Sequence, residues 1–141
     1  MDINNKIKLG DLGEKIAEEY LGKKGYTILK KNFRSEFGEI DIIAADKEWT
    51  IFVEVKTRTG ARYGSPEESI YFNKVDRIRK AALAFLKDSK TGEKKSIRFD
   101  VISIKLDKDR LLRTFYRDPG ILKLAGKYKI FSSIEHITDA F

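Results

Sequence analysis

Apolar residues recur along the first half of the chain with two different periods, and each period predicts its own kind of element. Residues 5–24 repeat apolar side chains at steps of three and four, which is typical of a helix with one buried face. Gly25 follows as a helix stop. Three segments rich in β-branched and aromatic residues then predict strands: YTILKKNF (26–33), GEIDIIAA (38–45) and WTIFVEVKT (49–57).

The second half of the chain begins with a helix-start signal, SPEE at 65–68. Its serine suits the N-cap, its proline the first helical position, and its second glutamate a capping box. An apolar stripe behind it predicts a helix that continues to about Lys87. SIRFDVISIKL (96–106) predicts a fourth strand, LLRTFY (111–116) is a candidate fifth, and DPG (118–120) marks a turn.

The order of these elements, αβββαβ, predicts the fold class. Strands interrupted by a helix indicate an α/β fold with a mixed sheet flanked by helices. A chain of 141 residues is expected to form a single domain over residues 1–141, large enough to bury a core.

Charge adds a candidate partner to this picture. The formal net charge is +7 and the isoelectric point is about 9.5. These values suit a polyanion such as nucleic acid, and an excess of surface lysine explains them equally well. Residues 105–131 hold eight basic and three acidic side chains and so supply +5 of the net charge. We expect this basic extension, 106–131 within the domain, to be either a solvated face or a flap against phosphates.

Residue types that the chain lacks exclude several classes of protein. The absence of cysteine excludes disulfides and thiolate metal sites, and the single histidine, His136, argues against zinc. No apolar run approaches the roughly 20 residues that span a membrane, and the polar start MDINNKIKLGD does not resemble a signal peptide. We therefore expect a cytoplasmic protein with no membrane association.

Charged residues inside the apolar strand WTIFVEVKT indicate a site. Strand side chains alternate between faces. In this strand the two sets are Ile51, Val53 and Val55 on one face, and Phe52, Glu54 and Lys56 on the other. In the preceding strand they are Ile40, Ile42 and Ala44, and Glu39, Asp41 and Ile43. Burial of both faces would make an unpaired charge costly. The alternative is an exposed polar face that carries a minor ion pair.

The loop between these two strands decides whether Asp41 and Glu54 meet. A loop of two residues, 47–48, or of four, 46–49, makes paired positions sum to 95 and places Asp41 opposite Glu54, with Cβ atoms about 5 Å apart. An odd loop places them on opposite faces. Facing carboxylates repel, so we predict a positive group between them, either Lys56 or, better, a divalent cation. Carboxylates and carbonyl groups suit Mg2+ or Mn2+.

The first predicted helix offers a third acid. Glu14 falls at the edge of the apolar stripe beside Gly10 and Ala17, whose small size allows a close approach to the sheet. Glu18 and Glu19 point further out, so Glu14 is the acid on this helix best placed to reach the strands. A solvated glutamate favoured by the helix dipole explains it equally well.

Taken together, these residues resemble the PD-(D/E)xK nuclease superfamily, whose restriction-endonuclease-like core has the order αβββαβ. A closer resemblance is to the bacterial YraN-type family of predicted endonucleases, which is similar to archaeal Holliday-junction resolvases. The resembling blocks are GEKIAEEYLGKKGYTIL, NFRSEFGEIDIIAAD, FVEVKTR, KVDRIRKAALAFL, RFDVI and IEHITDAF. They cover roughly residues 8–105 and the last ten. Two departures are Ile40, where the superfamily has proline, and the basic stretch 106–131, which is longer than the family usually has.

The resemblance implies a role for each matching position. Asp41 and Glu54 match the acidic metal ligands, with the backbone carbonyl of Val55 as a third ligand. Lys56 matches the motif lysine, and Glu14 matches the helix acid of the resolvase-like branch, reaching the metal through water. The implied cofactor is Mg2+ (or Mn2+). We expect Lys56, held between two carboxylates, to stay protonated and to orient the nucleophile rather than act as a base.

Four basic residues are candidates to bind flanking phosphates, although surface charge explains each equally well: Arg58, Arg62, Lys74 and Arg77. The function implied is a metal-dependent endonuclease that hydrolyses phosphodiester bonds in DNA, with branched or single-stranded DNA as candidate substrates. Cutting a symmetric junction would favour a homodimer. One alternative is a nucleic-acid-binding module with the nuclease fold but no turnover. A weaker one is a structural partner in a DNA-processing complex.

Overall fold

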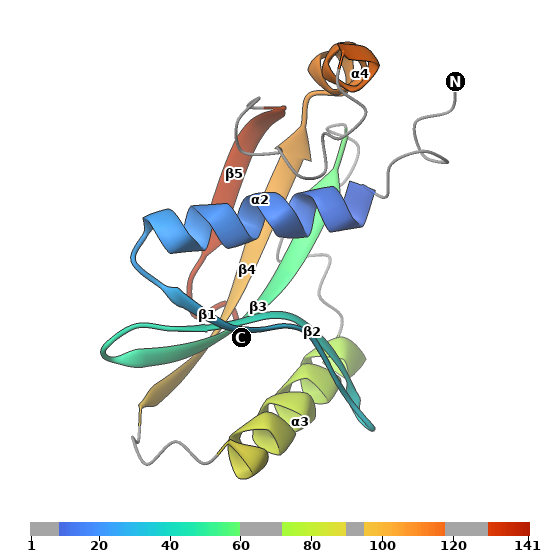
Figure 1. Ribbon diagram of the computed structural model, residues 1–141. Coiled ribbons are helices and arrows are strands. Elements are labelled where there is room, and N and C mark those ends of the chain that lie inside the picture. The colour runs from blue at the N-terminus through green and yellow to red at the C-terminus, as the bar shows by residue number, and fades with distance from the viewer. Residues whose placement is uncertain (1–8, 60–71, 90–94, 118–129) are drawn as a thin grey trace.

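Five strands form one mixed sheet at the centre of the protein. The computed structural model describes residues 9–59, 72–89, 95–117 and 130–141. The strands are β1 (Thr27–Ser35), β2 (Gly38–Ala45), β3 (Trp49–Arg58), β4 (Ser96–Leu106) and β5 (Phe131–Ile137), and they lie side by side in chain order (Figure 1). Neighbouring strands are antiparallel except β3 and β4, which are parallel.

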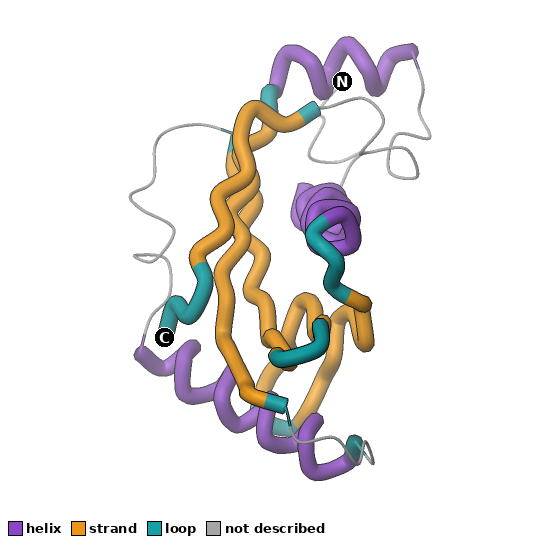
Figure 2. Tube along the Cα trace, turned by 90° about the vertical axis from the view of Figure 1, so that its left-hand side faces the viewer, coloured by secondary structure: helices purple, strands orange, loops and turns teal. Residues whose placement is uncertain are grey.

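Helices cover the two faces of this sheet. α2 (Leu9–Lys23) packs mainly on β3, and α3 (Phe72–Asp88) packs mainly on β2 from the other side (Figures 1 and 2). α3 lies between β3 and β4 in the chain, as a connection between parallel strands requires. α4 (Lys108–Arg117) follows β4. The order from α2 to β4 is the predicted αβββαβ, and the arrangement fits the expected restriction-endonuclease-like α/β core.

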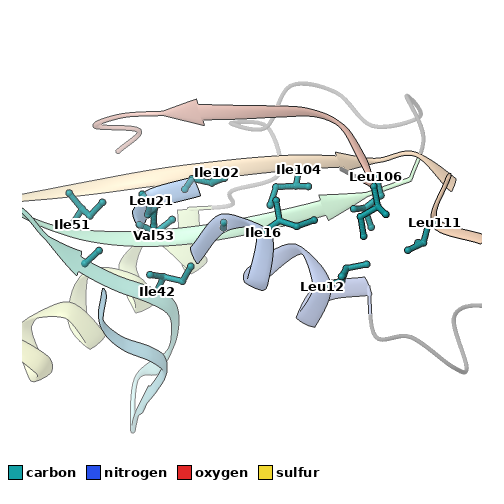
Figure 3. Close-up of a cluster of buried hydrophobic side chains, with 13 residues drawn as sticks. Leu12, Ile16, Leu21, Ile42, Ile51, Val53, Ile102, Ile104, Leu106 and Leu111 are labelled. Atoms are coloured by element: carbon teal, nitrogen blue, oxygen red, sulfur yellow. The ribbon is translucent and has the colours of Figure 1, made fainter. Parts of the chain in front are cut away.

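Two hydrophobic cores lie on opposite faces of the sheet. The larger lies under α2, and its buried side chains from the helix and from β2, β3 and β4 meet in Figure 3. The smaller lies under α3 and is built from Ile40, Ile43, Phe52, Ile78, Ala81 and Ala82, with phenylalanines packed around them. Because β2 and β3 are buried on both faces, a charged side chain on either strand needs a partner.

Side-chain alternation holds in β3 and fails at one position of β2. Ile51 and Val53 enter the larger core and Phe52 the smaller, as predicted. Ile40, predicted to share a face with Ile42, instead packs in the smaller core. The regular pleat breaks beside Asn32 of β1, whose φ of +51° is left-handed. The register of β1 and β2 places this residue opposite the position between the two isoleucines.

The β2–β3 hairpin has the predicted even loop. All paired positions along it sum to 95. The backbone N–H of Asp46 donates to the carbonyl of Trp49 at 3.0 Å, which leaves Lys47 and Glu48 as the loop. The Asp46 carboxylate accepts the backbone N–H groups of Glu48 and Trp49, at 2.9 and 2.7 Å, and so fixes the turn.

Residues 111–116 lie in helix α4, so the strand predicted there is wrong. The Asp107 carboxylate accepts the backbone N–H of Arg110 at 3.1 Å, and its carbonyl accepts that of Leu111 at 2.9 Å. Asp107 is therefore an N-cap. Leu111 is fully buried in the larger core, which ties the helix to the sheet. Packing and capping outweigh the strand propensity of the aromatic and β-branched residues in this segment.

A buried ionic cluster, the Asp100 cluster, fastens β5 to the rest of the fold. Asp100 of β4 has no exposed surface and accepts two hydrogen bonds from the Arg98 guanidinium at 2.8 Å. It also lies 2.7 Å from Nε2 of His136 on β5, whose Nδ1 lies 3.1 Å from the hydroxyl of Tyr20 on α2. Burial opposes the ionised form of Asp100, but the hydrogen bonds from His136 and Arg98 outweigh it and lower the pKa of this carboxyl.

Several predictions concern segments outside the described residues. The helix start at 65–68, the turn at 118–120 and residues 118–129 of the basic extension 106–131 are among them. The predicted helix 5–24 is described from Leu9 to Lys23. Within the described ranges, no helix is long and apolar enough to span a membrane.

Candidate active site

Asp41 lies where β2 and β3 separate. The ladder between the strands ends at the pair Ile42 and Val53, one position before Asp41 and Glu54. The predicted pairing of Asp41 with Glu54 therefore lies just beyond the hydrogen-bonded ladder. Asp41 Oδ2 accepts the backbone N–H of Val55 at 2.8 Å. Its side chain also lines two hollows, a pocket of about 540 Å³ beside α3 and one of about 280 Å³ beside α2. The carboxylate is thus reached from both faces of the sheet.

The surroundings of Asp41 disfavour its negative charge. Burial, followed by the nearby charge of Glu54, raises its pKa from 3.8 to about 8, although the hydrogen bond from Val55 acts the other way. Glu14 on α2 hydrogen-bonds to Asp41 and also raises this pKa. Burial raises the pKa of Glu14 itself. The metal-free site therefore holds a proton that isolated carboxylates would have released at neutral pH.

Glu14 meets the sheet because α2 approaches β3 very closely at Gly13. A Cβ added at Gly13 would overlap the side chain of Thr57, whereas one at Gly10 would meet nothing within 4 Å. The close approach is therefore made at Gly13. Of the two small residues predicted to allow it, Gly10 has no neighbour within 4 Å, whereas Ala17 is fully buried in the larger core. Glu14, predicted to be the acid of this helix best placed to reach the sheet, hydrogen-bonds to Asp41 of β2. Glu18, predicted to point further out, also reaches a strand, since it pairs with Lys31 of β1 at 3.2 Å.

Asn32 is a site residue that the sequence analysis missed. With its amide nitrogen turned toward the acids, it donates to Glu14 Oε2 at 3.3 Å and to Glu39 Oε1 at 3.2 Å. The same residue carries the left-handed φ that breaks the pleat beside Asp41. An asparagine inside an otherwise regular strand was the available signal, because asparagine tolerates this conformation better than most residues.

Glu54 is 7% exposed and faces two lysines. Lys56 and Lys74 both contact its Oε1, Lys56 at 3.5 Å and Lys74 more closely. Burial and the neighbouring Lys74 lower the pKa of Lys56. Burial also acts against the charge of Lys74, but its hydrogen bond to Glu54 outweighs this and raises its pKa. The expectation that two carboxylates flank Lys56 is wrong, since a carboxylate and an ammonium flank it.

The donor set suits a hard divalent cation with few protein ligands. Mg2+ is commonly held by one or two carboxylates, with water and substrate phosphates completing its shell. Asp41 and Glu54 provide such a pair beside the open pocket, with Glu14 behind Asp41. Among the described residues, no group of three or more histidine, cysteine, aspartate or glutamate side chains is arranged to hold a metal.

The predicted phosphate-binding residues separate into three groups. Lys74 and Arg77 of α3 line the same pocket as Asp41 and Glu54, with Arg77 exposed. Arg58 is the last residue of β3, partly buried and outside the lining of that pocket. Arg62 lies outside the described residues.

The candidate site lies within the part of the chain that matches a known protein family. Residues 13–104 match the uncharacterised protein family UPF0102. A UPF0102 protein of Caldanaerobacter subterraneus subsp. tengcongensis is 46% identical over 107 residues, 76% of this chain and 87% of that protein. A UPF0102 protein of Clostridium botulinum is 48% identical over 99 residues, which are 70% of this chain and 80% of that protein. A UPF0102 protein of Rhodococcus jostii is 46% identical over 100 residues, which are 71% of this chain and 84% of that protein. These names state no activity.

Proposed function

The chain belongs to the uncharacterised protein family UPF0102, the YraN-type family that its sequence resembles, and from its site we propose that it is a metal-dependent endonuclease hydrolysing phosphodiester bonds in DNA. The observation that carries the proposal is the partly buried carboxyl of Asp41 beside Glu54, with both residues lining one open pocket. The charge of Glu54 disfavours the ionised form of Asp41, and a cation between the two acids would remove that cost. The positive net charge of +7 supports a polyanionic substrate.

Each residue of the site has a proposed role. Asp41 and Glu54 would hold Mg2+ or Mn2+, with the carbonyl of Val55 as a further ligand and Glu14 acting through water. The bound ion polarises the phosphate and lowers the pKa of a water molecule. Lys56, beside Glu54, would orient the nucleophile and donate hydrogen bonds to the phosphoryl oxygens, where negative charge develops in the transition state.

Substrate preference is proposed from the shape and charge around the pocket. The pocket is open, and Lys74 and Arg77 stand on its α3 wall, where they could contact phosphates on either side of the scissile bond. We propose branched or single-stranded DNA as the first substrates to test, in line with the resemblance to junction resolvases. A homodimer would supply two such sites to a symmetric junction.

The test is a cleavage assay with labelled single-stranded, duplex, flap and four-way-junction DNA in Mg2+, Mn2+ or EDTA. We expect metal-dependent cleavage of at least one of these substrates. Asp41→Asn and Glu54→Gln should slow it by at least about 100-fold, since loss of a residue that only supports a ligand costs 10–100-fold. Glu36→Gln, at an exposed position of the β1–β2 connection, is the control. Absence of cleavage with either metal, or full activity in Asp41→Asn, would contradict the proposal.

One observation favours a second candidate function, a nucleic-acid-binding module without turnover. Glu54 is already paired with Lys74, so a cation is present at the site without any metal. This reading predicts DNA binding that weakens steeply as salt rises, no cleavage, and no effect of Glu54→Gln on affinity. Binding measured in parallel with the cleavage assay separates the two.

A further inference from the structure

Lys74 is paired with Glu54, the acid that the proposed metal requires. It is the third residue of α3 and crosses to the sheet, where its ammonium contacts Glu54 Oε1. Glu54 is 7% exposed, so its charge depends on a partner. An ordinary surface lysine that awaits a phosphate would point to solvent. Lys74 therefore has a role within the site.

The site holds more positive charge than Glu54 alone requires. Lys56 contacts the same oxygen at 3.5 Å, so two ammonium groups share one carboxylate oxygen. A divalent cation bound between Asp41 and Glu54 would add two further positive charges at this point. Like charges within about 4 Å repel by several kcal/mol at the effective dielectric of a protein surface. The metal ion and the ammonium groups of Lys56 and Lys74 therefore cannot all remain in close contact with Glu54.

The structure indicates which lysine is free to leave. Lys56 is part of β3, two residues from Glu54, and its backbone is fixed in the ladder with β4. Lys74 reaches the carboxylate from a helix on one wall of an open pocket, and its side chain is the more exposed of the two, 38% against 29%. A rotamer change would carry the Lys74 ammonium into that pocket without moving the sheet.

We propose that Lys74 is a displaceable internal cation, which neutralises Glu54 in the metal-free protein and must leave it when a divalent metal binds. The inference rests on the proposed metal site. Lys74 keeps the buried acid paired before metal loading, so the apo protein is stable, and it weakens metal affinity by competing for Glu54. Once released, its ammonium lies in the pocket where a substrate phosphate would bind.

The test compares Mn2+ affinity in Lys74→Met and in a matched control, Lys80→Met. Lys80 is on the same helix, and its side chain is 53% exposed and paired with Asp76 at 3.1 Å. Both variants lose one positive charge of α3 and one ion pair, with buried Glu54 in the first and with exposed Asp76 in the control. The comparison therefore isolates the effect of the contact with Glu54 from the loss of a helix charge. Isothermal titration should show Mn2+ binding about tenfold tighter in Lys74→Met than in the wild type, and within about twofold of it in Lys80→Met.

Thermal unfolding gives an independent readout. In EDTA, Lys74→Met should melt below Lys80→Met, because Glu54 has lost its closer partner. In saturating Mg2+ this difference should vanish or reverse, because tighter binding stabilises the folded state more. Lys74→Gln should change the Mn2+ affinity and the melting temperature in the same directions as Lys74→Met does. Lys74→Arg, which keeps the positive charge, should behave as the wild type does.

The outcomes separate this inference from the proposed function. If neither the wild type nor any variant binds Mn2+, the metal site itself is refuted, and the role of Lys74 with it. If the wild type binds Mn2+ and Lys74→Met binds it no more tightly than Lys80→Met, Lys74 does not compete with metal. The proposed function then stands and the inference is overturned.

Discussion

Replacing Asp41 by asparagine should make the metal-free protein more stable, and increasingly so as the pH rises. Asparagine matches the shape of a protonated aspartic acid and still offers an oxygen to the N–H of Val55, which Asp41 contacts at 2.8 Å. It carries no charge, so it avoids the cost of ionising a partly buried carboxyl beside Glu54. The comparison is made in EDTA, so that no metal offsets that cost.

The direction and size follow from the raised pKa. Asp41 has a pKa of about 8 in the folded protein and 3.8 in its ordinary state, so the folded state holds the proton more tightly. The resulting stabilisation is complete below pH 3.8 and is lost as the pH rises through about 8. A shift of this size corresponds to at most about 6 kcal/mol. Because Asp41 and Glu14 titrate together, we expect about 2–4 kcal/mol.

The assay is urea unfolding followed by the fluorescence of Trp49, the single tryptophan, at several pH values from 4.5 to 9. The free energy of unfolding of Asp41→Asn, minus that of the wild type, should rise with pH and level off above about 8. Taking the difference cancels the titration of groups common to both proteins. For Glu36→Gln, at an exposed position, the difference in the free energy of unfolding from the wild type should stay constant with pH within about 0.5 kcal/mol. A pH-independent difference for Asp41→Asn, or one that falls with pH, would refute the reasoning.

Two further predictions concern the fold that holds the site. Asp100→Ala should lower the free energy of unfolding by about 3–5 kcal/mol, because it leaves the partly buried Arg98 without its fully buried carboxylate partner; a loss below 1 kcal/mol in urea unfolding would show that the cluster is dispensable. Gly13→Ala should cost about 1–3 kcal/mol through overlap with Thr57, whereas Gly10→Ala on the same helix should be neutral or stabilising. Equal melting temperatures for the two alanine variants would contradict the close approach of α2.

The hairpin that carries the candidate site could be predicted because its geometry is local. Side-chain alternation along β3 separates Val53 from Glu54, and an even loop after Asp46 sets which residue of β2 lies opposite. Both depend on residues within about 20 positions of one another. The helix acid Glu14 could be placed because helical periodicity fixes its side of the apolar stripe.

What the sequence could not show depends on contacts between distant elements. The pairing of Lys74 with Glu54 follows from how α3 packs across the sheet, and no spacing in the chain encodes it. The turn of Ile40 to the other face depends on the backbone of Asn32 on the neighbouring strand. The alternation rule considers only the residues of β2 itself, so it cannot include the effect of a residue on β1.

The strand β5 was not predicted from the sequence for a different reason, because its apolar residues lack the alternation of a strand. The apolar residues of β5, Phe131, Ile134 and Ile137, recur every third position and do not alternate as strand residues should. The strand is held by pairing with β4 and by the contact of His136 with buried Asp100. Tertiary contacts therefore decide this element.

The most direct test of the central claim, that Asp41 and Glu54 together hold a divalent cation, is a crystal soaked in Mn2+ and measured for anomalous scattering. The account predicts a peak within about 2.2 Å of a carboxylate oxygen of each residue, with the Lys74 ammonium withdrawn from Glu54. No peak between the two carboxylates at saturating Mn2+, with Lys74 still paired to Glu54, would contradict it.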